Sequence, residues 1–243
     1  MISVRGLTKL YGDFSAVRSI SFDVGVGEIL GLVGPNGAGK TTLIRCLAGI
    51  AAADRGAIYI DGEEFRRDRM DFRRRMHILP DFPALFWDQS VLRNISIILR
   101  LFEADKEGTE DRVVELLRDF DLLPLSLRPV NSLSRGQAYK TALVALIAAG
   151  RDLWLLDEPF ASGMDPHGID AFKRHARAAA AQGSIILYST QLLDVAERFS
   201  DRVCVIHKGE IRAFDTLTRL REGAQDKDNV LEELFRQLRD DRE

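Results

Sequence analysis

The sequence predicts an α/β fold with an antiparallel β subdomain at its N terminus and an α-helical subdomain inserted into the core. Three observations lead to this prediction. A glycine-rich motif around residue 40 joins an apolar strand to a helix. After residue 150, apolar runs typical of buried strands alternate with helical patterns. Between Leu79 and Leu153 the apolar residues instead keep a helical period, so we expect no strand there.

Composition places the chain among ordinary globular proteins, since 46% of its 243 residues are hydrophobic and 29% are charged. We expect one large domain spanning residues 1–243. The formal net charge of -3 argues against a nucleic-acid partner. Cys46 and Cys204 lie in apolar segments and are expected to be buried free thiols in a reducing compartment.

The sequence does not predict a secreted or membrane-spanning chain. Arg5 and Lys9 interrupt the apolar N terminus, which argues against a signal-peptide core. The longest apolar runs, such as residues 142–149, are too short to cross a bilayer. We therefore expect a cytoplasmic protein, and a function at a membrane would depend on other chains for the spanning segments.

The N-terminal segment is predicted to form the β subdomain. Ile2–Leu10 and Ser19–Val24 have strand character and flank turn-forming residues, and Ala57–Ile60 supplies another short strand. Tyr11 is the one aromatic residue of that turn. Taken alone, it fits equally well a ring that stacks on a nucleotide base and a plain surface aromatic residue.

The segment Gly34–Thr42 fits the pattern G-x-x-x-x-G-K-[ST] of a phosphate-binding loop. It follows a predicted buried strand, Ile29–Val33, and precedes a predicted helix, Leu43–Ala48, which is the context that such a loop requires. Glycines let backbone N–H groups converge on an anion, and the helix N terminus favours negative charge. Lys40 is expected to reach the β- and γ-phosphates of a nucleotide, and the Thr41 hydroxyl to bind Mg²⁺. The residues expected to bind phosphate are Gly34, Asn36, Gly37, Ala38, Gly39, Lys40, Thr41 and Thr42.

A basic cluster and a helical insert follow this motif. The arginines of residues 66–75 alternate with aspartates, and such mixed charge favours a solvated helical face over a lipid or nucleic-acid site. Apolar residues then repeat with helical spacing from Val91 to Ala149. Ser134 is a favourable N-cap for the last of these helices, whose N terminus is a second potential anion site.

Two acidic residues follow a predicted buried strand. The apolar run Leu153–Leu156 ends at Asp157 and Glu158, and the carboxyl end of such a strand is where α/β sheets hold their ligands. Because the chain also has a phosphate-binding loop, we expect Asp157 to face Mg²⁺ and Glu158 to face the attacking water, rather than to form a plain acidic turn.

The remaining segments complete the core and add a tail. Pro166–Gln182 is predicted to be a helix that begins with proline, Ser184–Ser189 a further strand, and Val203–Phe214 a hairpin. The tail is predicted to end in an amphipathic helix that docks on the core or on a partner. The apolar face of this helix consists of Val230, Leu231, Leu234, Phe235 and Leu238.

Taken in order, these motifs carry a resemblance to the nucleotide-binding subunit of ABC transporters over the whole chain. Besides the phosphate-binding loop and the Asp157-Glu158 pair, Leu133–Gln137 is similar to the L-S-G-G-Q signature of that family. Ser162–Asp165 looks like its D-loop. The stretches Ile78–Asn94 and Ser189–Gly209 look most like the exporter branch, in which the ATPase and the membrane subunits are separate chains.

The resemblance implies a P-loop NTPase (RecA-like) core with three parts. The α/β ATP-binding core, together with the β subdomain, would comprise residues 1–81 and 151–215. Residues 82–150 would form the helical signature subdomain, and residues 216–243 the C-terminal helical tail.

The resemblance also implies an ATPase that uses Mg²⁺, dimerises around ATP, and powers export through a separate integral membrane permease. The second nucleotide-binding subunit would be identical or homologous, and the chain would lie at the inner face of the cell membrane, held by its permease. Lys40 and Glu158 would hold the phosphates and polarise the attacking water, and Tyr11 would stack on adenine. The residues that would cap the γ-phosphate from the other subunit are Ser134, Gly136 and Gln137.

Three positions depart from the family pattern. Arg135 stands where the signature usually has glycine, which the cap tolerates because it needs the Ser134 hydroxyl and the Gly136 backbone. Asp81 stands at the glutamine position of the Q-loop, where a carboxylate can still ligate Mg²⁺ directly or through water. Gln191 stands at the position of the switch histidine; it can donate a hydrogen bond to the γ-phosphate, but it cannot become cationic.

These departures leave two other functions open. Gln191 fits a regulatory ATP-binding module with little turnover, paired with a more active homologue, although Glu158 argues against that function. The second alternative is a soluble ABC ATPase that acts on ribosomes or DNA. Those relatives usually carry two such domains or long insertions, and this chain has neither.

Overall fold

The fold contains a small antiparallel sheet at the N terminus. The computed structural model describes the backbone of residues 1–223 and 230–240 and the side chains of residues 1–222 and 230–236. The sheet has the strand order β2-β1-β4-β5. Its strands are β1 (Ile2–Tyr11), β2 (Phe14–Val24), β4 (Arg55–Ile60) and β5 (Glu63–Glu64). The predicted β subdomain is therefore present, but β2 starts at Phe14 rather than at Ser19 because it pairs with β1 as far as Tyr11.

A six-stranded sheet forms the core, with the order β10-β9-β3-β8-β7-β6. Its first five strands in sequence are parallel to one another, and β10 is antiparallel to β9. The strands are β3 (Ile29–Val33), β6 (Met76–Leu79), β7 (Leu153–Leu156), β8 (Ile185–Thr190), β9 (Arg202–His207) and β10 (Glu210–Thr216). Parallel strands end at one edge of a sheet, so the loops that follow β3, β6, β7 and β8 gather at a common edge.

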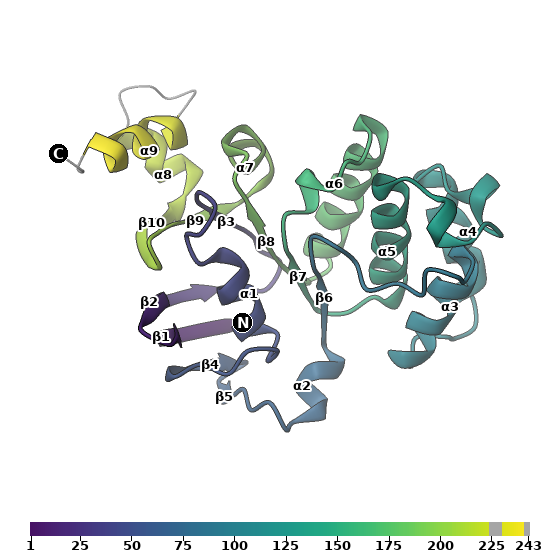
Figure 1. The fold of residues 1–243 in the computed structure, drawn as a ribbon, viewed down its shortest axis with the longest axis horizontal. Helices are drawn as coiled ribbons and strands as arrows, with labels where there is room; N and C mark the ends of the chain where they lie inside the picture. The colour runs from purple at the N-terminus through teal and green to yellow at the C-terminus, as the bar shows by residue number, and fades with distance from the viewer. Residues whose placement is uncertain (224–229, 241–243) are drawn as a thin grey trace.

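Helices cover this sheet, and a group of them lies to one side of it (Figure 1). The described α-helices are α1 (Lys40–Leu47), α2 (Met70–Arg74), α3 (Val91–Leu101), α4 (Thr109–Asp119), α5 (Arg135–Ala149), α6 (Pro166–Ala181), α7 (Leu193–Phe199), α8 (Leu217–Gly223) and α9 (Val230–Asp240). Residues 80–152 contain no strand beyond an isolated bridge between Ser90 and Pro129, as the helical period predicted.

Both faces of the core sheet are covered, which explains why its strands are apolar without alternation. Trp154 and Tyr188 pack on the helical side, in the cluster that contains α5 and α6. Their neighbours Leu155 and Leu187 pack on the opposite side, against α1 and the N-terminal sheet. This alternation fixes which side of the sheet each following residue faces.

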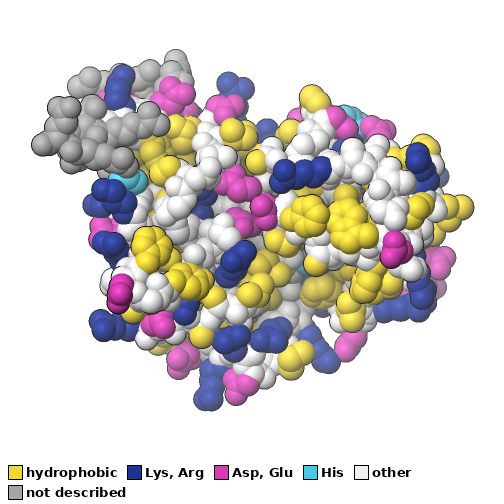
Figure 2. Space-filling model, viewed as in Figure 1, with side chains coloured by type: hydrophobic (Ala, Val, Ile, Leu, Met, Phe, Trp, Pro, Cys, Tyr) yellow, Lys and Arg dark blue, Asp and Glu magenta, His cyan; other side chains and the backbone are white. Residues whose placement is uncertain are grey.

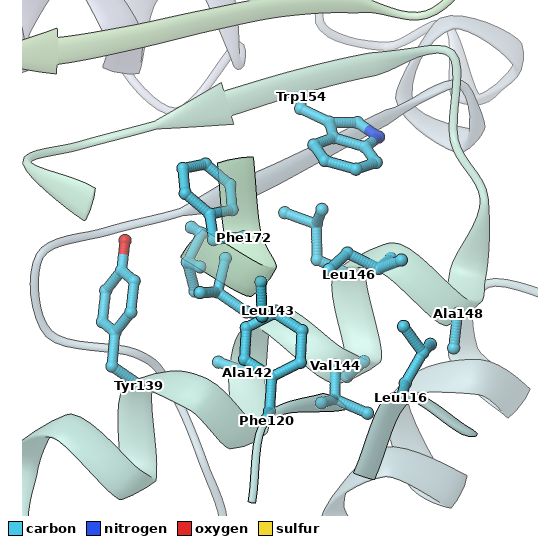
Figure 3. Close-up of a cluster of buried hydrophobic side chains, with 14 of the residues drawn as sticks. Leu116, Phe120, Tyr139, Ala142, Leu143, Val144, Leu146, Ala148, Trp154 and Phe172 are labelled. Atoms are coloured by element: carbon cyan, nitrogen blue, oxygen red, sulfur yellow. The ribbon is translucent and has the colours of Figure 1, made fainter. Parts of the chain in front are cut away.

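The helix α5 lies inside the helical lobe, the group formed by α3, α4, α5 and α6 on one side of the core sheet. Nearly every residue from Gly136 to Ala149 is buried, so this helix has no polar face. Figure 3 shows Leu143 and Val144 of α5 together with Leu116 and Phe120, which come from the segment of α4, and with Phe172 of α6. Such packing holds the N terminus of α5 in a fixed place.

Two predictions about outlying segments were only partly right. The basic cluster is helical only in α2, and the arginines before Met70 lie in a loop where Arg67 donates to the backbone carbonyls of Gly49 and Ile50. The prediction of a docked tail holds for Val230 and Leu231, which are buried against the core, and for Leu234 and Phe235, which pack beside them. Leu238 lies outside the described side chains. Helix α7 was not predicted.

The two cysteines are buried and free, as expected. Burial raises the pKa of Cys46 to about 11 and the pKa of Cys204 to about 12. Neither thiol therefore ionises near neutral pH, and neither is a nucleophile.

Candidate active site

The predicted phosphate-binding loop lines a cavity of about 430 Å³ at the carboxyl edge of the core sheet. In Figure 2, acidic side chains gather near the middle of this face, between the two lobes of the molecule. The lining residues are Tyr11, Phe14, Ala16, Asn36, Gly37, Ala38, Gly39, Lys40, Thr41, Thr42, Asp81, Asp157 and Glu158. The structure thus brings together most of the site residues that the sequence predicted.

Glycine is required within the loop for steric reasons. A Cβ atom on Gly34 would lie 2.3 Å from the carbonyl oxygen of Ile206, and one on Gly39 would lie 2.3 Å from that of Ala16. Gly39 also has a φ of +107°, which L side chains rarely adopt. The loop therefore follows a tight path that ends at the N terminus of α1, where backbone N–H groups attract anions.

Lys40 is buried and binds within its own loop. Its Nζ donates to the carbonyl oxygens of Gly34 at 2.7 Å and Pro35 at 3.2 Å. The same atom lies 3.3 Å from Oε1 of Glu158. Oε2 of Glu158 is buried and has no hydrogen-bond partner among the described residues. A cation and a carboxylate with a free oxygen thus stand side by side at the loop.

Asp157 connects three elements of the site. Its Oδ1 accepts hydrogen bonds from the Thr41 hydroxyl at 3.1 Å and from the Ser189 hydroxyl at 2.6 Å. Since Leu156 and Tyr188 pack on the helical side of the sheet, Asp157 and Ser189 face the other side, where α1 carries Thr41.

Ser189 was not among the predicted site residues. The signal that would have identified it is the change from apolar residues to the hydroxyl residues Ser189 and Thr190 at the end of strand β8. This strand is the neighbour of β7, which precedes the two acids.

Asp81 and Tyr11 complete the rim of the cavity. Asp81 follows β6, the neighbour of β7, and so reaches the same edge as Asp157. Tyr11 is 50% exposed, and the Lys9 ammonium lies 5.4 Å from the centre of its ring. Phe14, which the sequence did not single out, pairs with Tyr11 across the hairpin and offers a second exposed aromatic ring.

The signature residues do not line this cavity. Ser134 caps α5 by accepting a hydrogen bond from the N–H of Gln137, whose Oε1 accepts one from the N–H of Ser134. Ser134 and Arg135 are exposed. Gln191 is also exposed and absent from the lining. Gln191 nevertheless follows Thr190, whose carbonyl oxygen accepts the N–H of Gly34 at 3.3 Å, so it lies beside the start of the phosphate-binding loop. Ser134 was expected to act on the loop of a second subunit, and within one chain it does not line the cavity.

The donors present fit a nucleotide with Mg²⁺. In the described part of the chain, no group of three or more His, Cys, Asp or Glu side chains is placed to hold a metal by itself. Mg²⁺ is ordinarily held by one or two carboxylates together with substrate phosphates, and it prefers oxygen ligands. Thr41, Asp157 and Asp81 offer only oxygen atoms, beside a loop shaped for phosphate.

A second cavity, of about 590 Å³, has a different chemical character. Its lining is mostly apolar and includes Arg45, Arg67 and Arg73, and Asp157 is its one acidic residue. Lys40 and Glu158 are not among its lining residues. The smaller cavity is thus the one with the groups for phosphate chemistry.

Comparison with known proteins identifies the family. The model of the family described as ABC transporter matches residues 17–161, more than half of the chain. This chain belongs to the ABC transporter family. As a member of the family, it is an ATP-binding cassette and an ATPase. ABC ATP-binding subunits act as dimers together with membrane permeases, whereas no helix in the described part of this chain is long and apolar enough to cross a bilayer.

Individual relatives cover most of this ABC ATPase. The ABC-type transporter ATP-binding protein EcsA of Bacillus subtilis is 32% identical over 98% of this chain and 96% of its own length. The Nod factor export ATP-binding protein I of Burkholderia orbicola is 36% identical over 86% of this chain and 68% of its own length. The daunorubicin resistance ATP-binding protein DrrA3 of Streptomyces coeruleorubidus is 32% identical over 90% of this chain and 69% of its own length.

Solved structures share the fold. The ATP-binding subunit of an ABC transporter superposes with a TM-score of 0.89 at 30% identity, covering 97% of this chain and 99% of that one. A dimeric ATP-binding cassette in a post-hydrolysis state, bound to ADP and Pi, gives a TM-score of 0.79 at 21% identity. The match covers 89% of this chain and 98% of that chain. At that identity, the second likeness concerns the fold alone.

Proposed function

We propose that this ATPase hydrolyses Mg-ATP in the smaller cavity and thereby drives export through a separate membrane permease. The observation that carries the proposal is the cluster of Lys40, Thr41, Asp157 and Glu158 around the glycine-rich loop. Export is supported by the names of the relatives for Nod factor export and daunorubicin resistance. The chain would be held at the inner face of the membrane by its permease.

Each group of the cavity has a role in this proposal. Lys40 exchanges its carbonyl contacts for oxygens of the β- and γ-phosphates, and the loop N–H groups surround the same phosphates. Thr41, Asp157 and Asp81 would hold Mg²⁺, which would supply charge neutralisation at the phosphates. Glu158, with one oxygen unpartnered, orients the attacking water and accepts its proton. The Tyr11 ring stacks on adenine.

The exposed signature residues act on another subunit. The cavity lining includes neither Ser134 nor Gly136, so a second subunit placed head to tail is the arrangement that brings them to ATP. The N terminus of α5 then caps the γ-phosphate from the opposite side. Gln191, also exposed, donates a hydrogen bond to the γ-phosphate in the same closed state. The second subunit is a copy of this chain or a homologue.

Single-turnover hydrolysis by the purified chain tests this function. Protein in excess over labelled Mg-ATP should convert it to ADP and phosphate, and an added permease should accelerate steady-state turnover. Binding without conversion would indicate a regulatory module instead and would contradict the proposal.

Asp81 should make ATP binding unusually dependent on Mg²⁺. Its carboxylate lines the cavity with Asp157 and Glu158, and a metal ion must screen these charges from the triphosphate. Asp81→Gln is therefore expected to raise the affinity for ATP in EDTA by about tenfold, or about 1.4 kcal/mol, and to raise it much less with Mg²⁺.

Calorimetric titration under both conditions measures this difference. Asp68→Asn is the matched control, because Asp68 is an exposed carboxylate that pairs with Arg66 away from the cavity. Equal gains in EDTA and in Mg²⁺ would mean that Asp81 does not face the phosphates.

A further inference from the structure

We propose that Ser189 is a positioning residue for both acids of the ATP site, an inference that rests on the proposed function. The Ser189 side chain is fully buried at the end of β8. Its hydroxyl donates to Oδ1 of Asp157 at 2.6 Å and accepts the backbone N–H of Glu158 at 2.9 Å. A hydroxyl carries one proton and two lone pairs, so both bonds form at the same time.

The first bond fixes the carboxylate of Asp157. A distance of 2.6 Å between the oxygens of Ser189 and Asp157 is typical of a strong bond from a hydroxyl to a carboxylate. Thr41 donates to the same oxygen over the longer distance of 3.1 Å, and in the proposed mechanism a lone pair of its hydroxyl would also bind Mg²⁺. Ser189 is thus the donor with the shorter bond to Asp157, and its hydroxyl has no proposed role as a metal ligand.

The second bond fixes the backbone from which Glu158 projects. Glu158 has a φ of +48°, in the left-handed region that non-glycine residues rarely adopt. A strained backbone persists only when its surroundings hold it, and the Ser189 hydroxyl is a partner of its N–H group. The direction of this peptide sets where the Glu158 carboxylate lies, with Oε1 3.3 Å from Nζ of Lys40.

Ser200 provides a matched control. Its hydroxyl is also buried and lies 2.8 Å from the hydroxyl of Tyr188, the residue before Ser189 in β8. Tyr188 packs on the helical side of the sheet, so this pair faces away from the ATP cavity. Ser200→Ala therefore removes a buried hydroxyl of the same kind without touching the site.

The experiment measures kcat and KM for Mg-ATP, and the Mg²⁺ concentration at half-maximal rate, in the full chain. Ser189→Ala should lower kcat by about ten- to a hundredfold, the size expected for losing hydrogen bonds to a charged group. The KM should stay within about threefold, because the phosphate-binding loop is intact, and the required Mg²⁺ concentration should rise. Ser189→Thr, which keeps a hydroxyl, should retain most of kcat, and Ser200→Ala should keep both constants.

Ser189→Cys covers the case in which the alanine variant does not fold, since a thiol fills the space but is a weak donor. It should lose kcat as the alanine variant does. The inference is overturned if the Ser189 variants without a hydroxyl keep kcat within twofold, or if Ser200→Ala loses as much. Absence of hydrolysis by the unaltered chain is a different result, which overturns the proposed function and this inference with it.

Discussion

Replacing Lys40 with alanine is expected to abolish tight binding of ATP. Its buried ammonium is the one cation among the residues that line the cavity, which also include Asp81, Asp157 and Glu158. Without it, only Mg²⁺, hydroxyl and amide groups and backbone N–H groups would offset the negative charge of the triphosphate beside these carboxylates. We expect the Kd for Mg-ATP to rise at least about a hundredfold, or about 2.7 kcal/mol.

Isothermal titration calorimetry checks this result. Lys106→Ala is the control for loss of a lysine, because Lys106 is exposed in the loop between α3 and α4 and lies outside the cavity lining. A thermal melt should show that both variants fold. A Kd within threefold of the unaltered chain would mean that Lys40 does not bind the phosphates, and the proposed site would have to be abandoned.

Glu158→Gln should preserve ATP binding but nearly stop hydrolysis. The amide keeps the size of the carboxylate but does not accept a proton from water, and general bases typically contribute 10²–10⁴-fold in rate. ATP should then persist between two subunits and hold them together. We expect phosphate release to fall by about a hundredfold or more and the mass in solution to double with Mg-ATP.

Light scattering after size exclusion gives the mass, and a phosphate-release assay gives the rate. Glu115→Gln makes the same chemical change on the exposed side of α4 and should alter neither. Continued phosphate release by monomeric Glu158→Gln would show that another group activates the water.

The parts of the site that the sequence predicted are contiguous in the chain. The geometry of Gly34–Thr42 is set locally, because the glycines, the lysine and the helix start are neighbours in sequence. Asp157 and Glu158 were predicted because a strand tip restricts where they can lie. Tyr11 was left open between two interpretations, and the structure places it on the rim of the same cavity.

The parts that the sequence missed depend on distant segments. Ser189 meets Asp157 only because β7 and β8 pair. The left-handed backbone conformation of Glu158 could not be predicted either, because in a sequence such a conformation is usually indicated by glycine. The arginines before Met70 were expected in a helix, but hydrogen bonds to the backbone carbonyls of Gly49 and Ile50, in an earlier segment of the chain, hold Arg67 in a loop. The roles of Ser134 and Gln191 stay predictions, because neither residue lines the cavity.

Cross-linking between the phosphate-binding loop and the signature tests the central claim, that each ATP lies between two subunits. Pro35 and Arg135 are both exposed, and Cys46 and Cys204 are buried, so Pro35→Cys and Arg135→Cys would add the only accessible thiols of the described residues while leaving the proposed phosphate-binding and capping side chains in place. The two substitutions are combined with Glu158→Gln, and a short thiol-specific cross-linker is added with or without Mg-ATP. The account predicts a covalent dimer that forms only with Mg-ATP and only when both cysteines are present. A chain that stays monomeric with Mg-ATP, or that dimerises equally through either cysteine alone, would contradict it.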